Sequence, residues 1–178
     1  VLAIAWKMNS AEDAISKGRD PNNTGLNVWS TMILEIEPTY PQGGHVVWSC
    51  DAWDHLVQDF DPSLPSYGNP RDFPGKIDVN YEALGGTSYA ARDWLHANSV
   101  DYNPLRNEIM ISVRGFSELW IIDRDSSSDL KYRWGNTMAY GRGLAEDQVL
   151  FQQHNCHWIE PGLPGEGQVL IYNNGTFR

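Results

Sequence analysis

The stretch EIMISVRGFSELWIIDRDSSSDLKYRW, residues 108–134, carries the clearest fold signal in the chain. It contains three short apolar runs separated by turn-forming residues: Glu108–Arg114, Glu118–Arg124 and Leu130–Trp134. Short runs rich in Ile, Val, Trp and Tyr between Gly, Ser and Asp are typical of β-strands. Together with Asn98–Tyr102, which precedes an Asn-Pro turn, these runs predict a four-stranded antiparallel meander.

The same arrangement recurs in two other parts of the chain. VLAIAW (1–6) aligns with EIMISVR, MILEIEP (32–38) with ELWIIDR, and VVWSC (46–50) with LKYRWGN. A further copy begins at HNCHWIEP (154–161) and continues through a Gly-Leu-Pro-Gly turn into QVLIYNNG (168–175). A recurring unit of about four strands is typical of the blade of a β-propeller.

We therefore expect an all-β chain that covers roughly two blade-equivalents of a β-propeller plus long loops. Residues 1–58 would form part of one blade, 59–93 a long loop or insertion, 94–136 one full blade, and 137–178 a loop and the first half of the next blade. A propeller needs about four to eight blades to close its ring. The rest of the ring is therefore expected on further sequence or on another chain. A stand-alone β-sandwich is the alternative.

Composition excludes several classes of partner. The formal net charge of −10 disfavours nucleic acid, whose binding needs a basic surface. No apolar run reaches membrane-spanning length, so we expect no membrane span. The acidic composition is compatible with a secreted or periplasmic location, which we expect. Cys50 and Cys156 leave two possibilities open, one disulfide or two free thiols.

Two segments that would form inner strands begin alike, WLHANS (94–99) and QQHNCH (152–157). The innermost strand of each blade lines the central channel of a propeller, so His96 and His154 are expected to converge on one site. A ring of hydrogen-bonded structural histidines is the alternative. Arg114, near the same end, would offer a planar cationic fork to a sulfate or phosphate group. An ordinary surface ion pair is the alternative for Arg114.

Other chemistry has weaker support in the sequence. His154, Cys156 and His157 hint at a metal site, but strand alternation predicts that Cys156 shares a face with His154 and that His157 points away. Zinc-type spacing is also missing, so we expect no metal. The sequence has no phosphate-binding glycine loop and no G-x-S-x-G elbow, so we expect no cofactor. His55 is expected to be structural.

Several motifs together resemble those of bacterial arylsulfotransferases. They are WLHANSVDYNP (94–104), EIMISVRGFSELWIID (108–123), WGNTMAYGRG (134–143) and DQVLFQQHNCHWIE (147–160). IAWKMNSAEDAISKGRDP (4–21) and VVWSCDAWDHLVQDFDP (46–62) are also similar to that family. The resemblance therefore extends, in order, over nearly the whole chain.

The resemblance implies a six-bladed propeller that moves a sulfuryl group from a phenolic sulfate ester to a phenolic acceptor. Transfer in the family is independent of the nucleotide sulfate donor and passes through a covalent sulfo-histidine in a ping-pong cycle. On the matching motifs, the resemblance implies His154 as the nucleophile and His96, Asn98 and Arg114 as further catalytic residues. Asn98 and Arg114 would also bind the substrate.

The chain departs from the family after the nucleophile. The family commonly has Asp-Ala there, and this chain has Asn155-Cys156. An acidic neighbour could orient the histidine. The alternative function is therefore a non-catalytic secreted propeller that serves as a binding or structural module. A hydrolase acting on sulfate or phosphate esters through the same site is a third possibility.

Overall fold

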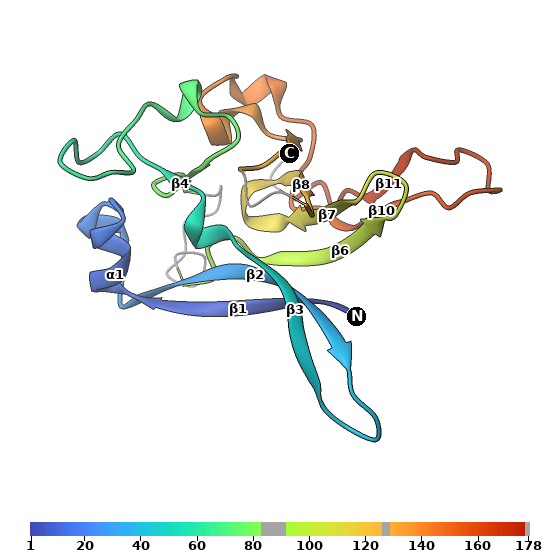
Figure 1. The fold of residues 1–178 in the computed structure, drawn as a ribbon. Helices are drawn as coiled ribbons and strands as arrows, with labels where there is room; N and C mark the ends of the chain where they lie inside the picture. The colour runs from blue at the N-terminus through green and yellow to red at the C-terminus, as the bar shows by residue number, and fades with distance from the viewer. Residues whose placement is uncertain (83–91, 126–128, 177–178) are drawn as a thin grey trace.

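The computed structural model describes residues 1–82, 92–125 and 129–176. Strands dominate these ranges, so the expected all-β class is confirmed (Figure 1). Helix α1 (Ala11–Ser16) begins where the Ser10 hydroxyl accepts a hydrogen bond from the Asp13 amide at 3.0 Å. Short 3-10 helices join the strands: η1 (Pro21–Asn23), η2 (Ala52–Asp54), η3 (Pro70–Asp72), η4 (Arg114–Phe116), η5 (Thr137–Tyr140) and η6 (Ala145–Asp147). No helix in the described ranges is long and apolar enough to cross a membrane.

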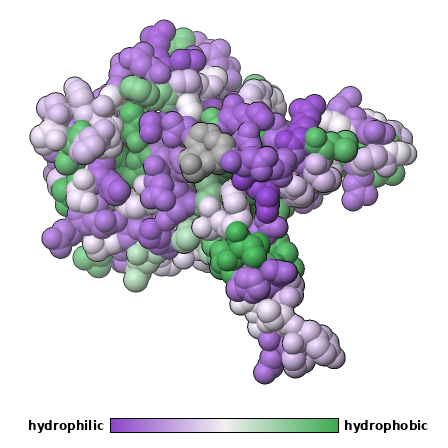
Figure 2. Space-filling view, in the orientation of Figure 1, coloured by the Kyte–Doolittle hydropathy of each residue, from purple (hydrophilic) through white to green (hydrophobic). Residues whose placement is uncertain are grey.

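The first sheet consists of β1 (Leu2–Ser10), β2 (Asn27–Pro38) and β3 (Gly44–Asp51) in that order, all antiparallel. Its strands include the segments that the alignment with the meander predicts, apart from Val1, and each strand is longer than its predicted segment. The β2–β3 hairpin projects away from the rest of the molecule (Figure 1). Figure 2 shows apolar surface over β3 at the base of this projection. Val46 and Val47 are exposed apolar residues of β3.

The second sheet is the predicted meander. It contains β6 (Ala97–Asn103), β7 (Glu108–Val113), β8 (Glu118–Asp123) and β9 (Tyr132–Trp134) in chain order. Every residue of β7 is buried because apolar clusters cover both of its faces. Ile109 and Ile111 join the main core, and Met110 joins a smaller cluster beneath the next sheet.

The third sheet pairs β10 (His154–Trp158) with β11 (Val169–Tyr172) and lies beside β6 (Figure 1). Side chains of β6 bond the backbone of this segment. The Asn98 amide donates to the Gln153 carbonyl at 2.9 Å, and the Ser99 hydroxyl accepts from the Cys156 amide at 2.9 Å. The sheets therefore adjoin as neighbouring units, while the propeller and its blade boundaries stay predictions.

The segment expected as a loop or insertion packs onto the core. Within it, β5 (Ile77–Asp78) pairs in parallel with β4 (Leu56–Val57). The side chains of Ile77 and Val79 are fully buried, and the Arg19 guanidinium donates to the Val79 carbonyl at 2.6 Å. Residues 83–91 of the expected loop lie outside the described residues. Cys50 and Cys156 are free thiols, which decides between the two possibilities left open by the sequence.

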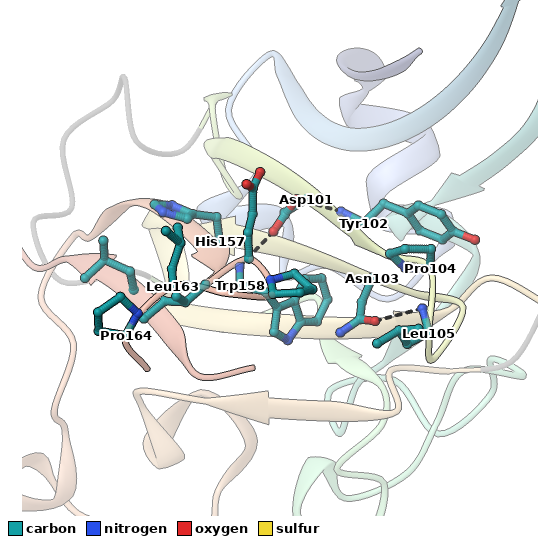
Figure 3. Close-up of a pocket in the computed structure, with 13 residues that line it drawn as sticks. Asp101, Tyr102, Asn103, Pro104, Leu105, His157, Trp158, Leu163 and Pro164 are labelled. Atoms are coloured by element: carbon teal, nitrogen blue, oxygen red, sulfur yellow. Dashed lines mark hydrogen bonds between the residues drawn. The ribbon is translucent and has the colours of Figure 1, made fainter. Parts of the chain in front are cut away.

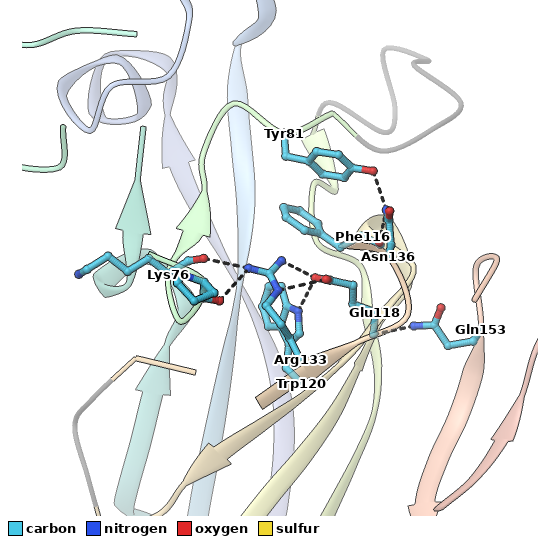
Figure 4. A network of polar contacts seen from close by, with 9 residues as sticks. Lys76, Tyr81, Phe116, Glu118, Trp120, Arg133, Asn136 and Gln153 are labelled. Atoms are coloured by element: carbon cyan, nitrogen blue, oxygen red, sulfur yellow. Dashed lines mark hydrogen bonds and ion pairs between the residues drawn. The ribbon is translucent and has the colours of Figure 1, made fainter. Parts of the chain in front are cut away.

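A buried ion pair between Glu118 and Arg133 lies within the meander, and Arg133 also bonds this segment (Figure 4). The side chains of Glu118 and Arg133 are 0% and 4% exposed. Arg133 Nε donates to Glu118 Oε1 at 3.0 Å, Trp120 Nε1 donates to Oε2 at 2.7 Å, and Arg133 Nη1 donates to the Lys76 carbonyl at 2.9 Å. Burial raises the pKa of Glu118, and the Arg133 charge opposes that shift.

Removing the Glu118 charge should destabilise the fold strongly. In Glu118→Gln, Arg133 stays buried without its counter-charge, which typically costs about 3–5 kcal/mol. Glu37→Gln is the matched control, because Glu37 pairs with His45 at 2.9 Å on the surface, where a pair contributes about 1 kcal/mol or less. Urea unfolding measures both variants. Equal losses of stability would contradict the importance assigned to the buried pair.

Asp78 should make stability depend on pH. Burial raises the pKa of this partly buried carboxyl to about 6, above its unfolded value, so the folded state favours the protonated form. The stability associated with that proton is present at pH 4 and is lost as the pH rises through 6. Asp78→Asn stays neutral and keeps an oxygen for the Asn80 amide, now accepted by Oδ1 at 2.9 Å.

In urea unfolding, Asp78→Asn should match the wild type at pH 4 and exceed it at pH 8, by at most roughly 3 kcal/mol. Asp61→Asn is the control, because hydrogen bonds from Ser63 lower the pKa of Asp61. This control should gain no stability at pH 8. If the difference in unfolding free energy between Asp78→Asn and the wild type is the same at pH 4 and pH 8, burial does not raise the pKa of Asp78.

Candidate active site

Strands β6 and β10 begin with the same backbone irregularity. Each has one extra residue relative to its partner strand, between Ala97 and Ser99 in β6 and between His154 and His157 in β10. Left-handed backbone accompanies both bulges, with φ of 46° at His96 and 52° at Asn155. A β-bulge redirects the side chains beside it and is common next to active sites. The two segments that look alike in sequence therefore share an unusual local structure.

His96 has a buried carboxylate as its partner. Its Nδ1 hydrogen-bonds Oδ2 of Asp93, whose side chain is 3% exposed, whereas that of His96 is 29% exposed. An ionised carboxylate can only accept, so Nδ1 of His96 carries a proton. Nε2 is then the ring nitrogen available for chemistry. Sequence reasoning missed Asp93, although it stands only three residues before His96.

His154 is oriented by its own chain and by the end of β11. Its Nδ1 lies 3.2 Å from the Gln152 carbonyl oxygen and 3.1 Å from the amide of Asn174. The backbone carbonyl can only accept, so this contact places the proton on Nδ1. The Asn174 atom at 3.1 Å is the amide nitrogen, which can only donate, so Asn174 must turn its amide oxygen toward the ring for both contacts to form. This tautomer leaves a lone pair on Nε2. Left-handed Gln152, with φ of 54°, turns its carbonyl toward the ring.

Arg114 joins the two histidine segments. Its backbone amide donates to the His96 carbonyl at 3.2 Å, and its Nη2 donates to Gln152 Oε1 at 2.7 Å. Gly115 allows this approach, because a Cβ there would lie 2.2 Å from the Trp94 carbonyl oxygen. A continuous set of contacts therefore runs from His96 through Arg114 and Gln152 to His154. Sequence reasoning also missed Gln152 and Asn174.

Asn98 has a more structural position than the sequence suggests. Its amide nitrogen holds the Gln153 carbonyl, and its Oδ1 is buried without a hydrogen-bond partner in the ranges that the structure describes. Asn98 thus fixes the residue that precedes His154. The catalytic roles of His96, Asn98, Arg114 and His154 stay predictions.

The expected directions of Cys156 and His157 are wrong. Because of the bulge, His154 lies opposite Tyr172 and His157 opposite Leu170, two β11 residues that share one face. His154 and His157 therefore face the same side. Cys156 packs on the other side in a buried apolar cluster with Met110 and Leu119. Among the described residues, no group of three or more His, Cys, Asp or Glu side chains could hold a metal ion.

A groove of about 890 Å³ lies between the β6–β7 turn and the β10–β11 hairpin (Figure 3). Tyr102, Trp158 and Leu163 line it, and the Asp101 carboxylate accepts from the Trp158 amide at 2.8 Å. The groove adjoins the ends of β6 and β10, whereas His96 and His154 stand at their beginnings. It is therefore separate from the histidine site.

Comparison with known proteins identifies the family of the chain. The model of the family described as Arylsulfotransferase (ASST) matches residues 10–178. None of the curated proteins and none of the solved structures compared matches the chain. The family match supports a sulfotransferase-type function and implies aryl sulfates and phenols as substrates. The chain belongs to the arylsulfotransferase family.

Proposed function

We propose that the protein transfers a sulfuryl group from a phenolic sulfate ester to a phenolic acceptor through a covalent sulfo-histidine at His154. The observation that carries this proposal is that Gln152 contacts both His154 and Arg114: its carbonyl lies 3.2 Å from His154 Nδ1, and its Oε1 accepts from Arg114 at 2.7 Å. The carbonyl contact leaves the Nε2 lone pair of His154 as the nucleophile, beside a cationic group, in a chain of the arylsulfotransferase family.

In the first half-reaction, His154 Nε2 forms a bond to the donor's sulfur while the bond from sulfur to the aryl oxygen breaks. The aryl oxygen leaves with the electron pair. His96, carrying a proton on each ring nitrogen, gives the Nε2 proton to that oxygen and becomes neutral. A phenol departs, and the sulfuryl group remains on His154.

In the second half-reaction, an acceptor phenol gives its proton to His96 Nε2 while its oxygen forms a bond to sulfur. The bond between His154 Nε2 and sulfur breaks, and its electron pair returns to the ring. Both histidines are then in their starting states. One covalent intermediate thus divides a difficult displacement into two similar steps.

Arg114 would stabilise the sulfuryl oxygens during both steps. Its guanidinium is permanently charged, and its planar donors suit an oxyanion. Its Nη2 bonds the neutral Oε1 of Gln152 at 2.7 Å. A sulfate oxygen is a stronger acceptor for a charged donor than an amide oxygen, so substrate would displace Gln152 from Arg114. Asn98 would act by holding Gln153, and through it His154, in place.

The propeller supplies the framework in this proposal. We assign β6 and β10 as inner strands of neighbouring blades. Their adjacency supports this assignment, as does the bulge that both contain at the equivalent position. Inner strands converge around one axis, which would bring the beginnings of both strands to a shared channel. We also propose that the protein is secreted or periplasmic.

Replacing His154 should abolish transfer. The purified protein, given 4-nitrophenyl sulfate and a phenol, should release nitrophenol and form the new ester, and His154→Ala should lose this activity by at least roughly 1,000-fold because no nucleophile remains. His157→Ala is the matched control. Its Nδ1 contacts the carbonyl two residues earlier at 3.2 Å, as that of His154 does, but it stands outside the proposed site and should stay active.

Mass spectrometry after exposure to the donor alone should find the sulfuryl group on the peptide that contains His154. Equal transfer by His154→Ala and wild type would exclude the nucleophile. A folded wild type that neither transfers sulfate nor becomes labelled would instead favour the non-catalytic binding module. Sulfate release without formation of the new ester would indicate a hydrolase.

A further inference from the structure

The geometry around His96 points to one more functional residue. We propose that Asp93 is a positioning residue, which holds His96 so that Nε2 faces the aryl oxygen of the substrate. This inference rests on the proposed function. Asp93 supports the proton transfer that His96 makes to the leaving group and does not contact the substrate itself.

The carboxylate of Asp93 is well placed for this role. Its side chain is 3% exposed, and its Oδ2 bonds His96 Nδ1. In the part of the chain that the structure describes, Oδ1 is buried without a hydrogen-bond partner. A buried carboxylate needs a proton donor or a positive charge nearby. The imidazole of His96 supplies the proton donor, and a charged imidazole would supply the positive charge as well.

The backbone between the two residues is held rigidly. Trp94 and Leu95 are buried in the core, and Trp94 Nε1 donates to the Tyr81 carbonyl at 3.0 Å. Gly115 donates its amide hydrogen to the Leu95 carbonyl at 2.8 Å. His96 then takes its left-handed conformation, which returns the ring toward Asp93. The contact is therefore built into the fold at this point.

A carboxylate in this position affects the proton on Nε2. It accepts Nδ1–H, which fixes the tautomer and the ring orientation, and it attracts the charge of the doubly protonated ring. The aryl oxygen needs this proton most when the departing phenolate is strongly basic. A nitrophenolate leaves readily as an anion. Loss of Asp93 should therefore lower the transfer rate more with phenyl sulfate than with 4-nitrophenyl sulfate as the donor.

A second Asp–His pair provides a matched control. His55 Nδ1 lies 3.3 Å from Oδ1 of Asp129, which also pairs with Lys76 at 3.4 Å. The side chain of Asp129 is 41% exposed, and this pair lines a different groove, near Cys50. Asp129→Asn removes the same kind of contact without touching the proposed site.

The test measures the rate of the first half-reaction with both donors. Asp93→Asn should lower the rate with phenyl sulfate by roughly 100-fold or more, which is the usual contribution of general acid catalysis. It should lower the rate with 4-nitrophenyl sulfate by less than about tenfold. Asp129→Asn should change neither rate. An equal loss with both donors would show that Asp93 only supports the fold and would overturn the proposal.

A spectroscopic measurement decides the point independently of activity. In protein with ¹⁵N-labelled histidine, the Nδ1 signal of His96 should be that of a protonated nitrogen, and Asp93→Asn should shift it. If Nδ1 of His96 carries no proton in the wild type, the role of Asp93 is refuted. This measurement needs only the wild type, so it decides the point even if the wild type transfers sulfate and Asp93→Asn fails to fold. Wild type with protonated Nδ1 but no transfer would refute the proposed function and leave the pairing of Asp93 with His96 established.

Discussion

The buried pair of Glu118 and Arg133 is the constraint on which the arrangement of the molecule depends. Two opposite charges without water are tolerable only together, so β8 and β9 must keep the register that joins them. The remaining donors of Arg133 reach the Pro74 and Lys76 carbonyls and tie the long irregular segment to the meander. Gln153 Nε2 donates to the Glu118 carbonyl at 2.7 Å, so the start of β10 is attached to the same residue (Figure 4).

This attachment explains why a site can form where two separate sheets meet. Strands β6 and β10 adjoin through side chains rather than through a backbone ladder, with Asn98, Ser99 and Asp101 as the partners on β6. Such contacts hold only if both strands already lie at a fixed separation. The Gln153 side chain, fully buried between Ser112 and Glu118, supplies that constraint.

The sequence predicts where the strands lie, but not the backbone geometry and side-chain contacts at their ends. EIMISVR and ELWIID form strands because β-branched and aromatic runs between turn residues leave few alternatives. The segments around His96 and His154 look alike in sequence, but the bulge that they share is not predicted from it. The partnership of Asp93 with His96 depends on a left-handed backbone, and the direction of His157 depends on one extra residue in β10. Neither follows from strand alternation. The burial of Ile77 depends on contacts distant in sequence.

The two residues that depart from the family pattern, Asn155 and Cys156, lie away from the contacts that orient His154. Asn155 is exposed in a left-handed bulge, and Cys156 is buried on the side away from His154. Neither residue is a hydrogen-bond partner of the His154 ring among the described contacts, which come from the Gln152 carbonyl and the Asn174 amide. A carbonyl on Nδ1 selects the same tautomer that a carboxylate would select. The difference in sequence therefore leaves the His154 ring oriented by other groups and keeps Nε2, the proposed nucleophile, free.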